Sequence, residues 1–191
     1  MTAKGGMLIM SKLGIFMANG CEEIEGLTVV DIARRAGIEI DTISITGENS
    51  VTSSHNVTFM TDTTKEKADF SKYDGIVLPG GMPGTTNLGA DETVNNVIKE
   101  FAAQGKLVAA ICAAPSVLGQ AGLLDGKKAT CFPGFEDKLT GADFTEDKVA
   151  VDGNIITSRG MGTTILFALE IVKYLTDEET ADTVAGKIMW K

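Results

Sequence analysis

The feature that most constrains the fold of this chain is the alternation of short apolar runs with amphipathic helical segments. The apolar runs occupy residues 13–18, 73–78 and 107–111. Segments with the helical spacing of apolar residues follow them, at 22–36, 91–104 and 113–121. Buried parallel strands joined by helices produce this alternation. We therefore predict an α/β fold with a doubly wound, mostly parallel sheet sandwiched by helices.

The rest of the sequence continues the same pattern. Further strands are predicted at 39–45, 128–130, 149–151 and 155–157, an antiparallel excursion over 51–60, and helices at 161–174 and 178–187. A length of 191 residues fits one domain. We predict an N-terminal extension over 1–11 and a single domain over 12–191. The apolar run near the N-terminus is too short and too polar for a signal peptide, and Met1 and Met10 are alternative starts.

Composition excludes several classes of function. The formal net charge of −9 argues against a general nucleic-acid binder and against binding to anionic membranes, and no apolar stretch is long enough to span a bilayer. Three cysteines at wide spacing and one histidine give neither a disulfide framework nor a usual zinc site. We expect a cytoplasmic protein with free thiols.

Cys112 directly follows the most apolar predicted strand and precedes a predicted helix. Ligands of doubly wound sheets bind beyond the carboxyl ends of the strands, so this thiol is expected at the ligand-binding edge. A helix dipole lowers the pKa of a thiol at its N-terminus, which predicts a nucleophilic thiolate. The residues alone leave open a buried cysteine that acts as a small hydrophobic side chain.

Glu25 differs from its acidic neighbours by its phase on the predicted helix. Glu22 and Glu23 are expected to face solvent, whereas Glu25 lies nearly one turn beyond Cys21 and can point to the same edge as the thiol. Burial next to another negative group would raise its pKa and make it a proton donor and acceptor. A solvated carboxylate in the first helical turn is the alternative.

Two glycine-rich loops lie at the same predicted edge. The loop over 80–84 can bring backbone N–H groups close to a reacting oxygen, as in an oxyanion hole, or it can be a plain tight turn. Residues 160–162 fail the phosphate-binding pattern GxGxxG because Ile165 stands where its third glycine belongs. We interpret that segment as a turn that starts a helix.

Taken together, four segments resemble the ThiJ/PfpI superfamily, and more narrowly a bacterial-type member of its Parkinson-disease deglycase (DJ-one) branch. They are residues 20–25 (GCEEIE), 78–81 (LPGG), 109–115 (AAICAAP) and 157–163 (TSRGMGT). The resemblance extends from about residue 12 to residue 188 with matching element order. It implies a flavodoxin-like sandwich, a homodimer, and chemistry without a cofactor or a metal.

The resemblance also implies roles for individual residues. Cys112 would be the reactive thiolate on a strained turn, and Glu25 the protonated carboxyl that hydrogen-bonds it. The backbone N–H groups of Gly81 and Ala113 would form the anion hole. Other residues are candidates to line the site: Gly80, Phe132, His55 and Met161.

Two departures from the superfamily pattern restrict which residues can transfer protons in the mechanism. The protease branch has a histidine where this chain has Ala113, and animal members of the closer branch have one where this chain has Phe132. A Cys–Glu pair must then handle all protons. His55 matches a position from which relatives extend an arginine to the site of the dimer mate, or it is a solvent-facing loop residue. Cys131 is either a resolving thiol or, as we favour, an inert cysteine.

The sequence therefore predicts a cysteine-dependent glyoxalase or deglycase acting on a small carbonyl substrate, namely methylglyoxal-type 2-oxoaldehydes or their adducts. One alternative is a redox sensor or chaperone that uses oxidation of Cys112 to a sulfinic acid without metabolic turnover. Another is an amidohydrolase whose general base is not histidine.

Overall fold

The computed structural model describes residues 11–190, so Met10 and most of the expected N-terminal extension lie outside the described residues. Its centre is a seven-stranded sheet in the order β10-β11-β7-β6-β1-β2-β5. All neighbouring strands in it are parallel except β10 and β11. The strands are β1 (Lys12–Met17), β2 (Glu39–Ser44), β5 (Thr63–Thr64), β6 (Gly75–Leu78), β7 (Leu107–Ile111), β10 (Val149–Asp152) and β11 (Ile155–Ser158).

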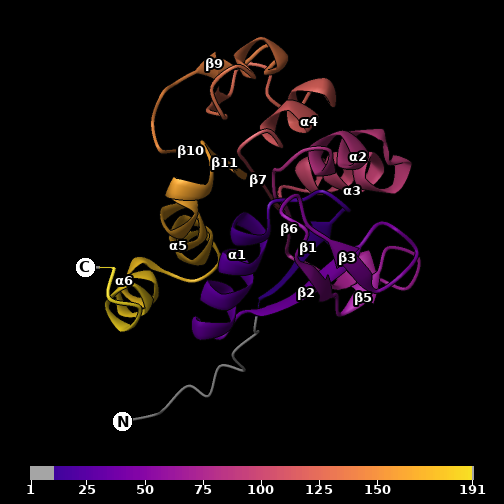
Figure 1. Cartoon of the computed structure of the whole chain (residues 1–191). Helices are drawn as coiled ribbons and strands as arrows, with labels where there is room; N and C mark the ends of the chain where they lie inside the picture. The colour runs from indigo at the N-terminus through magenta and orange to yellow at the C-terminus, as the bar shows by residue number, and fades with distance from the viewer. Residues whose placement is uncertain (1–10, 191) are drawn as a thin grey trace.

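Helices cover both faces of the sheet (Figure 1). One apolar cluster joins the sheet to α1 (Glu23–Arg35), α5 (Thr164–Leu175) and α6 (Glu178–Lys187). A second cluster lies on the opposite face, against α2 (Gly84–Ala90), α3 (Glu92–Ala103) and α4 (Pro115–Gln120). This three-layer arrangement confirms the predicted α/β sandwich.

Smaller strands and helical turns lie outside the seven-stranded sheet. A two-stranded antiparallel hairpin is formed by β3 (Ser50–Thr52) and β4 (Thr58–Met60), which confirms the antiparallel excursion. A second small pair consists of β8 (Lys128–Ala129) and β9 (Asp143–Phe144). Single 3₁₀ turns occur at η1 (Phe70–Lys72), η2 (Glu136–Lys138) and η3 (Met161–Thr163).

The helix boundaries follow from local capping chemistry. The side chain of Glu22 accepts a hydrogen bond from the N–H of Glu25 at the start of α1, and Gly37 has a φ of 79° just beyond its end. Asp91 caps α3 in the same way, as its sequence position predicts. The helix predicted over 113–121 is shorter in the structure, because Cys112 and its neighbours form a turn before α4 begins.

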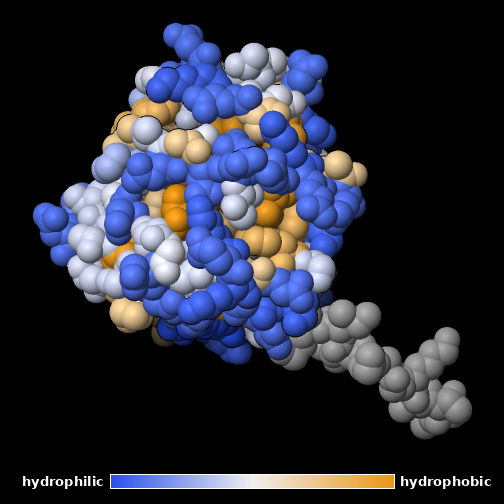
Figure 2. Space-filling view, turned by 90° about the vertical axis from the view of Figure 1, so that its right-hand side faces the viewer, coloured by the Kyte–Doolittle hydropathy of each residue, from blue (hydrophilic) through white to orange (hydrophobic). Residues whose placement is uncertain are grey.

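The described part of the chain contains no helix long and apolar enough to cross a membrane. Figure 2 shows one face of the molecule, on which hydrophilic residues dominate and apolar residues form small separate patches. This surface agrees with the strongly acidic composition.

Candidate active site

Four neighbouring strands of the sheet end at one edge and carry the candidate site. These strands are β11, β7, β6 and β1, and all four run parallel. Cys112 follows β7, Gly80 follows β6, and the loop after β1 leads into the helix that carries Glu25. The carboxyl ends of neighbouring parallel strands are the usual place for ligands in such sheets. The fold therefore brings together residues that are far apart in the sequence.

Cys112 occupies a sharp turn that its neighbours hold from both sides. Its φ is 66°, in the left-handed region that non-glycine residues rarely adopt and that costs on the order of 1–3 kcal/mol. Its N–H donates to the carbonyl of Ser158 at 2.9 Å, and its carbonyl accepts from the N–H of Phe132 at 2.8 Å. The backbone N–H groups of Gly81 and Ala113 lie close enough to its sulfur to lower the pKa of the thiol.

Glu25 lies beside Cys112, close enough for each group to change the pKa of the other. The carboxyl is 1% exposed, and its Oε2 accepts from the N–H of Gly80 at 2.9 Å. Burial raises the pKa of Glu25 to about 7, against the hydrogen bonds from Cys112 and Gly80, which lower it. The direction agrees with the prediction from the sequence. A carboxyl with this pKa exchanges protons near neutral pH.

The expectation that a helix dipole lowers the pKa of Cys112 is not supported. Burial, followed by the negative charge of Glu25, raises the pKa of the Cys112 thiol to about 12. The N–H groups of Gly81 and Ala113 act in the opposite direction without outweighing burial. Burial therefore disfavours the thiolate form of Cys112.

Gly80 and Gly81 lie where no other residue type fits. A Cβ atom at Gly80 would lie 2.6 Å from the Cβ of Cys112 and 2.7 Å from Oε2 of Glu25. Gly81 has a φ of 85°, and a Cβ there would lie 2.3 Å from the backbone nitrogen of Glu22. The two glycines thus allow the backbone after β6 to approach both reactive side chains.

We expect Gly80→Ala to reduce turnover by about a hundredfold or more, because the added methyl group must displace Cys112 or Glu25 from its position. Gly162→Ala is the matched control, since a Cβ at Gly162 meets no atom within 4 Å. Steady-state kinetics of both variants, with thermal melting to check folding, test this. Equal activities of the two variants would contradict the expectation.

Glu22 and Glu23 do not face solvent, contrary to the prediction. Their side chains are 13% and 12% exposed. The β3–β4 hairpin folds over the start of α1, where the N–H of Ser54 donates to the carbonyl of Cys21 at 2.8 Å. Helical periodicity describes only the helix itself, so it does not reveal a hairpin that covers it.

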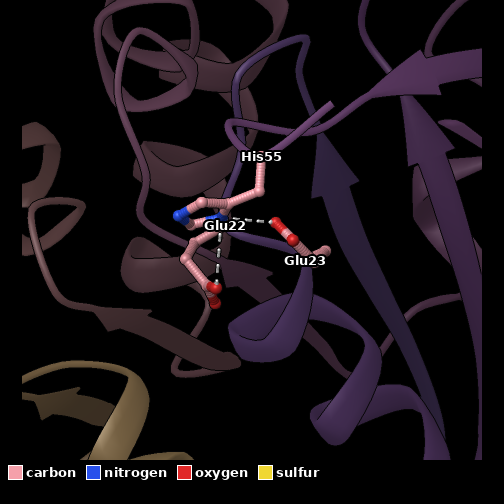
Figure 3. A group of neighbouring side chains, drawn as sticks. All are labelled: Glu22, Glu23 and His55. Atoms are coloured by element: carbon pink, nitrogen blue, oxygen red, sulfur yellow. Dashed lines mark hydrogen bonds and ion pairs between the residues drawn. The ribbon is translucent and has the colours of Figure 1, made fainter. Parts of the chain in front are cut away.

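His55 extends from this hairpin toward the two carboxylates (Figure 3). Its Nδ1 lies 3.1 Å from Oε2 of Glu23 and 3.9 Å from Oε1 of Glu22. The hydrogen bond with Glu23 raises the pKa of His55. The three side chains offer donor atoms within 4.8 Å of one another, which is the spacing of a metal site. The His55–Glu23 ion pair by itself accounts for that proximity.

The other candidate site residues differ in how they relate to the Cys112–Glu25 pair. Phe132 is bonded to Cys112 through its backbone, and Met161 opens η3 directly after Gly160. Cys131 is fully buried, and burial raises the pKa of its thiol to about 11, which fits an inert cysteine. In this chain His55 contacts Glu23 and not the thiol.

Three contributors to the site were not predicted. Glu22 holds the start of α1, because its Oε2 accepts the N–H of Glu25 at 2.6 Å. Ser158 accepts the N–H of Cys112. Met82 directly follows Gly81, in a loop for which no helix was predicted and which leads into α2. A capping pattern with acidic residues three apart was the available signal for Glu22, whereas Ser158 acts through its backbone and carries none.

Comparisons with known proteins identify the family of this chain. The model of the DJ-1/PfpI family matches residues 11–174. Protein DJ-1 homolog A of Arabidopsis thaliana is 39% identical over 91% of the chain, which spans only 45% of that relative. The chain thus spans about half the length of this relative. Protein dj-1beta of Drosophila melanogaster is 38% identical over 92% of the chain and 95% of the relative.

The crystal structure of Drosophila melanogaster DJ-1beta superposes with a TM-score of 0.91. It shares 36% identity and covers 95% of this chain and 98% of its own. A further relative, Deglycase PH1704 of Pyrococcus horikoshii, is 30% identical over 86% of this chain and 99% of its own length.

Proposed function

We propose that this chain, which belongs to the DJ-1/PfpI family, is a cofactor-free, cysteine-dependent glyoxalase or deglycase acting on 2-oxoaldehydes or their adducts. One observation carries the proposal: the Cys112 thiol and the buried Glu25 carboxyl meet at Gly80, where a Cβ atom would lie 2.6 Å from Cβ of Cys112 and 2.7 Å from Oε2 of Glu25. The backbone N–H groups of Gly81 and Ala113 lie close enough to lower the pKa of the thiol. This arrangement supplies a nucleophile, an acid/base and an oxyanion site. A relative named as a deglycase adds support.

In the first step, the Cys112 sulfur bonds to the aldehyde carbon of the substrate while the C=O double bond opens. The Glu25 carboxylate takes the thiol proton, which suits a pKa of about 7. The N–H groups of Gly81 and Ala113 stabilise the oxygen that becomes negative, because they already lie close to the sulfur. Glu25 then returns the proton to that oxygen, giving a hemithioacetal.

In the second step, Glu25 removes the proton on the former aldehyde carbon and delivers a proton to the neighbouring carbonyl carbon through an enediolate. The product is a thioester of a 2-hydroxy acid on Cys112. Water hydrolyses the thioester and restores the thiol, so the net reaction consumes one water and needs no oxidant or reductant. Methylglyoxal gives lactate.

The direct test follows methylglyoxal consumption and lactate formation by the purified protein, without glutathione. Stoichiometric conversion that depends on protein concentration is the expected result. Consumption of methylglyoxal without lactate would indicate chemical modification of the protein and would contradict the proposal. If the folded protein neither consumed methylglyoxal nor formed lactate, the proposed glyoxalase activity would be wrong.

The pH dependence of kcat/KM is expected to follow the Glu25–Cys112 pair. The carboxylate form of Glu25 is needed to accept the thiol proton, and its pKa is about 7. Activity should therefore rise with pH, about tenfold per unit below pH 7, and level off above it. Initial rates between pH 5 and 9 measure this. A midpoint near 4.5 or a fall in activity across pH 7 would contradict the assignment.

Redox sensing is the second candidate, because protonated Glu25 and the same N–H groups could stabilise a sulfinate on Cys112. Both functions start from the Cys112 thiolate, so the raised pKa of the thiol does not distinguish them. Mass spectrometry after graded peroxide distinguishes the two. A stable gain of two oxygens on Cys112 supports the sensor.

A further inference from the structure

Large apolar side chains lie exposed on three separate loops around the Cys112–Glu25 pair. Met82, Phe132 and Met161 are 51%, 46% and 57% exposed. Isolated exposed hydrophobic residues are common and need no explanation. Phe132 and Met161 differ because each lies next to residues that surround the Cys112–Glu25 pair. We call these two residues the apolar rim.

Phe132 is the best-placed member of the apolar rim. Its N–H donates to the carbonyl of Cys112, which fixes its backbone beside the thiol. A Cβ atom built on Gly160 would lie 3.2 Å from Cδ2 of Phe132 and 3.9 Å from Oε1 of Glu25. The ring edge and the Glu25 carboxyl thus approach the same point from two sides. A substrate on the thiol would have this ring as a neighbour.

Met161 continues the apolar rim beside Phe132. Met82 does not belong to it, because Met82 borders a separate cavity of about 390 Å³ between α2, α4 and η2 whose lining does not include Cys112 or Glu25. Met161 directly follows Gly160, the residue next to Phe132 and Glu25. Methionine side chains are flexible and polarizable, so they adapt to apolar groups of different shape.

An apolar side chain beside the thiol favours an apolar substituent on the substrate. A negatively charged substituent would lose its hydration against the Phe132 ring, whereas a neutral apolar substituent would not.

We propose that the apolar rim binds the substituent on the ketone carbon of the substrate, and that the chain prefers 2-oxoaldehydes with neutral, bulky apolar or aromatic substituents over methylglyoxal. This inference rests on the proposed function and names the substrate class of the same site. Phe132 and Met161 are its specificity-determining residues.

The first experiment compares kcat/KM for glyoxal, methylglyoxal, phenylglyoxal and 4-carboxyphenylglyoxal with the wild-type protein. We expect phenylglyoxal to exceed methylglyoxal by about tenfold, in the range that one or two buried carbon groups provide. The carboxylated analogue, which has the same ring and a negative charge, should fall below phenylglyoxal by a similar factor.

The second experiment measures the ratio of kcat/KM for phenylglyoxal to that for methylglyoxal in variants. Phe132→Ala and Met161→Ala should each lower this ratio several-fold. Phe144→Ala and Met189→Ala are matched controls, because both residues are exposed and lie on other segments, β9 and the C-terminal end. The controls should keep the wild-type ratio.

The outcomes separate this inference from the proposed function. Turnover of methylglyoxal with no preference for phenylglyoxal would contradict the role of the apolar rim in substrate specificity, but it would agree with the proposed glyoxalase activity. A preference that persists in Phe132→Ala and Met161→Ala would overturn the assignment of these residues. Turnover of neither substrate would overturn both proposals.

Discussion

Replacing Cys112 with serine is expected to lower lactate formation from methylglyoxal by about a thousandfold or more, to the background rate. The serine oxygen fits the space of the sulfur, but a hydroxyl is both less acidic and less nucleophilic than a thiol, so it does not replace Cys112 as the nucleophile. The N–H groups that lie close to the sulfur remain in the variant, because they belong to the backbone.

The control for this variant is Cys131→Ala, which removes a buried thiol that the mechanism does not use. It should keep most of the activity, and circular dichroism should show both variants folded. Equal activity of Cys112→Ser and wild type would mean that the thiol is not the nucleophile. The thioester predicted in the second step should also be trapped by hydroxylamine in the wild type alone.

Glu25→Gln should lower kcat/KM by about 10²–10⁴-fold, the usual contribution of a general acid/base. Glutamine keeps the shape of the side chain and an oxygen that accepts the N–H of Gly80, but it cannot take a proton from Cys112. Turnover close to wild type in this variant would remove Glu25 from the mechanism.

The same variant should change the pH dependence of stability. The pKa of Glu25 is about 7 in the folded protein and 4.5 for an ordinary glutamate. Stability from the buried neutral carboxyl is fully present below pH 4.5 and is lost as pH rises through 7. The loss approaches about 3 kcal/mol, since each pKa unit corresponds to about 1.4 kcal/mol. Glutamine has no charge to bury, so it escapes this loss.

The free energy of unfolding of Glu25→Gln should therefore increase relative to wild type by about 3 kcal/mol between pH 4.5 and pH 8.5. Urea unfolding of both proteins at several pH values measures the difference, in which other titrating groups cancel. Glu48→Gln, an exposed site on a turn, is the control and should show no such trend. A difference that stays constant with pH would contradict the folded-state pKa.

The sequence was most informative where a functional residue directly follows a predicted strand, because the end of the strand sets the position of that residue. The run over 107–111 becomes β7 with the same bounds, and Cys112 follows it on the expected sharp turn. Glu25 points to the same edge because its helical phase sets its direction, and only burial was needed to predict its raised pKa. The fold class followed from the alternation of strands and helices.

Features that depend on distant contacts were not predictable from local patterns. The hairpin over α1 buries Glu22 and Glu23, and only the folded chain places it there. The pKa of Cys112 depends on the balance between burial and two N–H groups, which no spacing reveals. The short helix α2 lacks an apolar stripe and a capping side chain. The homodimer implied by the resemblance stays a prediction.

The two backbone hydrogen bonds that hold the Cys112 turn have a consequence for folding during synthesis. Cys112 is held by backbone groups of Ser158 and Phe132, which are synthesised after it. Glu25, which accepts its proton, lies near the N-terminal end of the chain and is synthesised long before it. A nascent or partly unfolded chain therefore carries only an ordinary thiol at this position. The Cys112–Glu25 pair is thus assembled only when the native structure is complete, and aldehydes met during synthesis find no preassembled site to occupy.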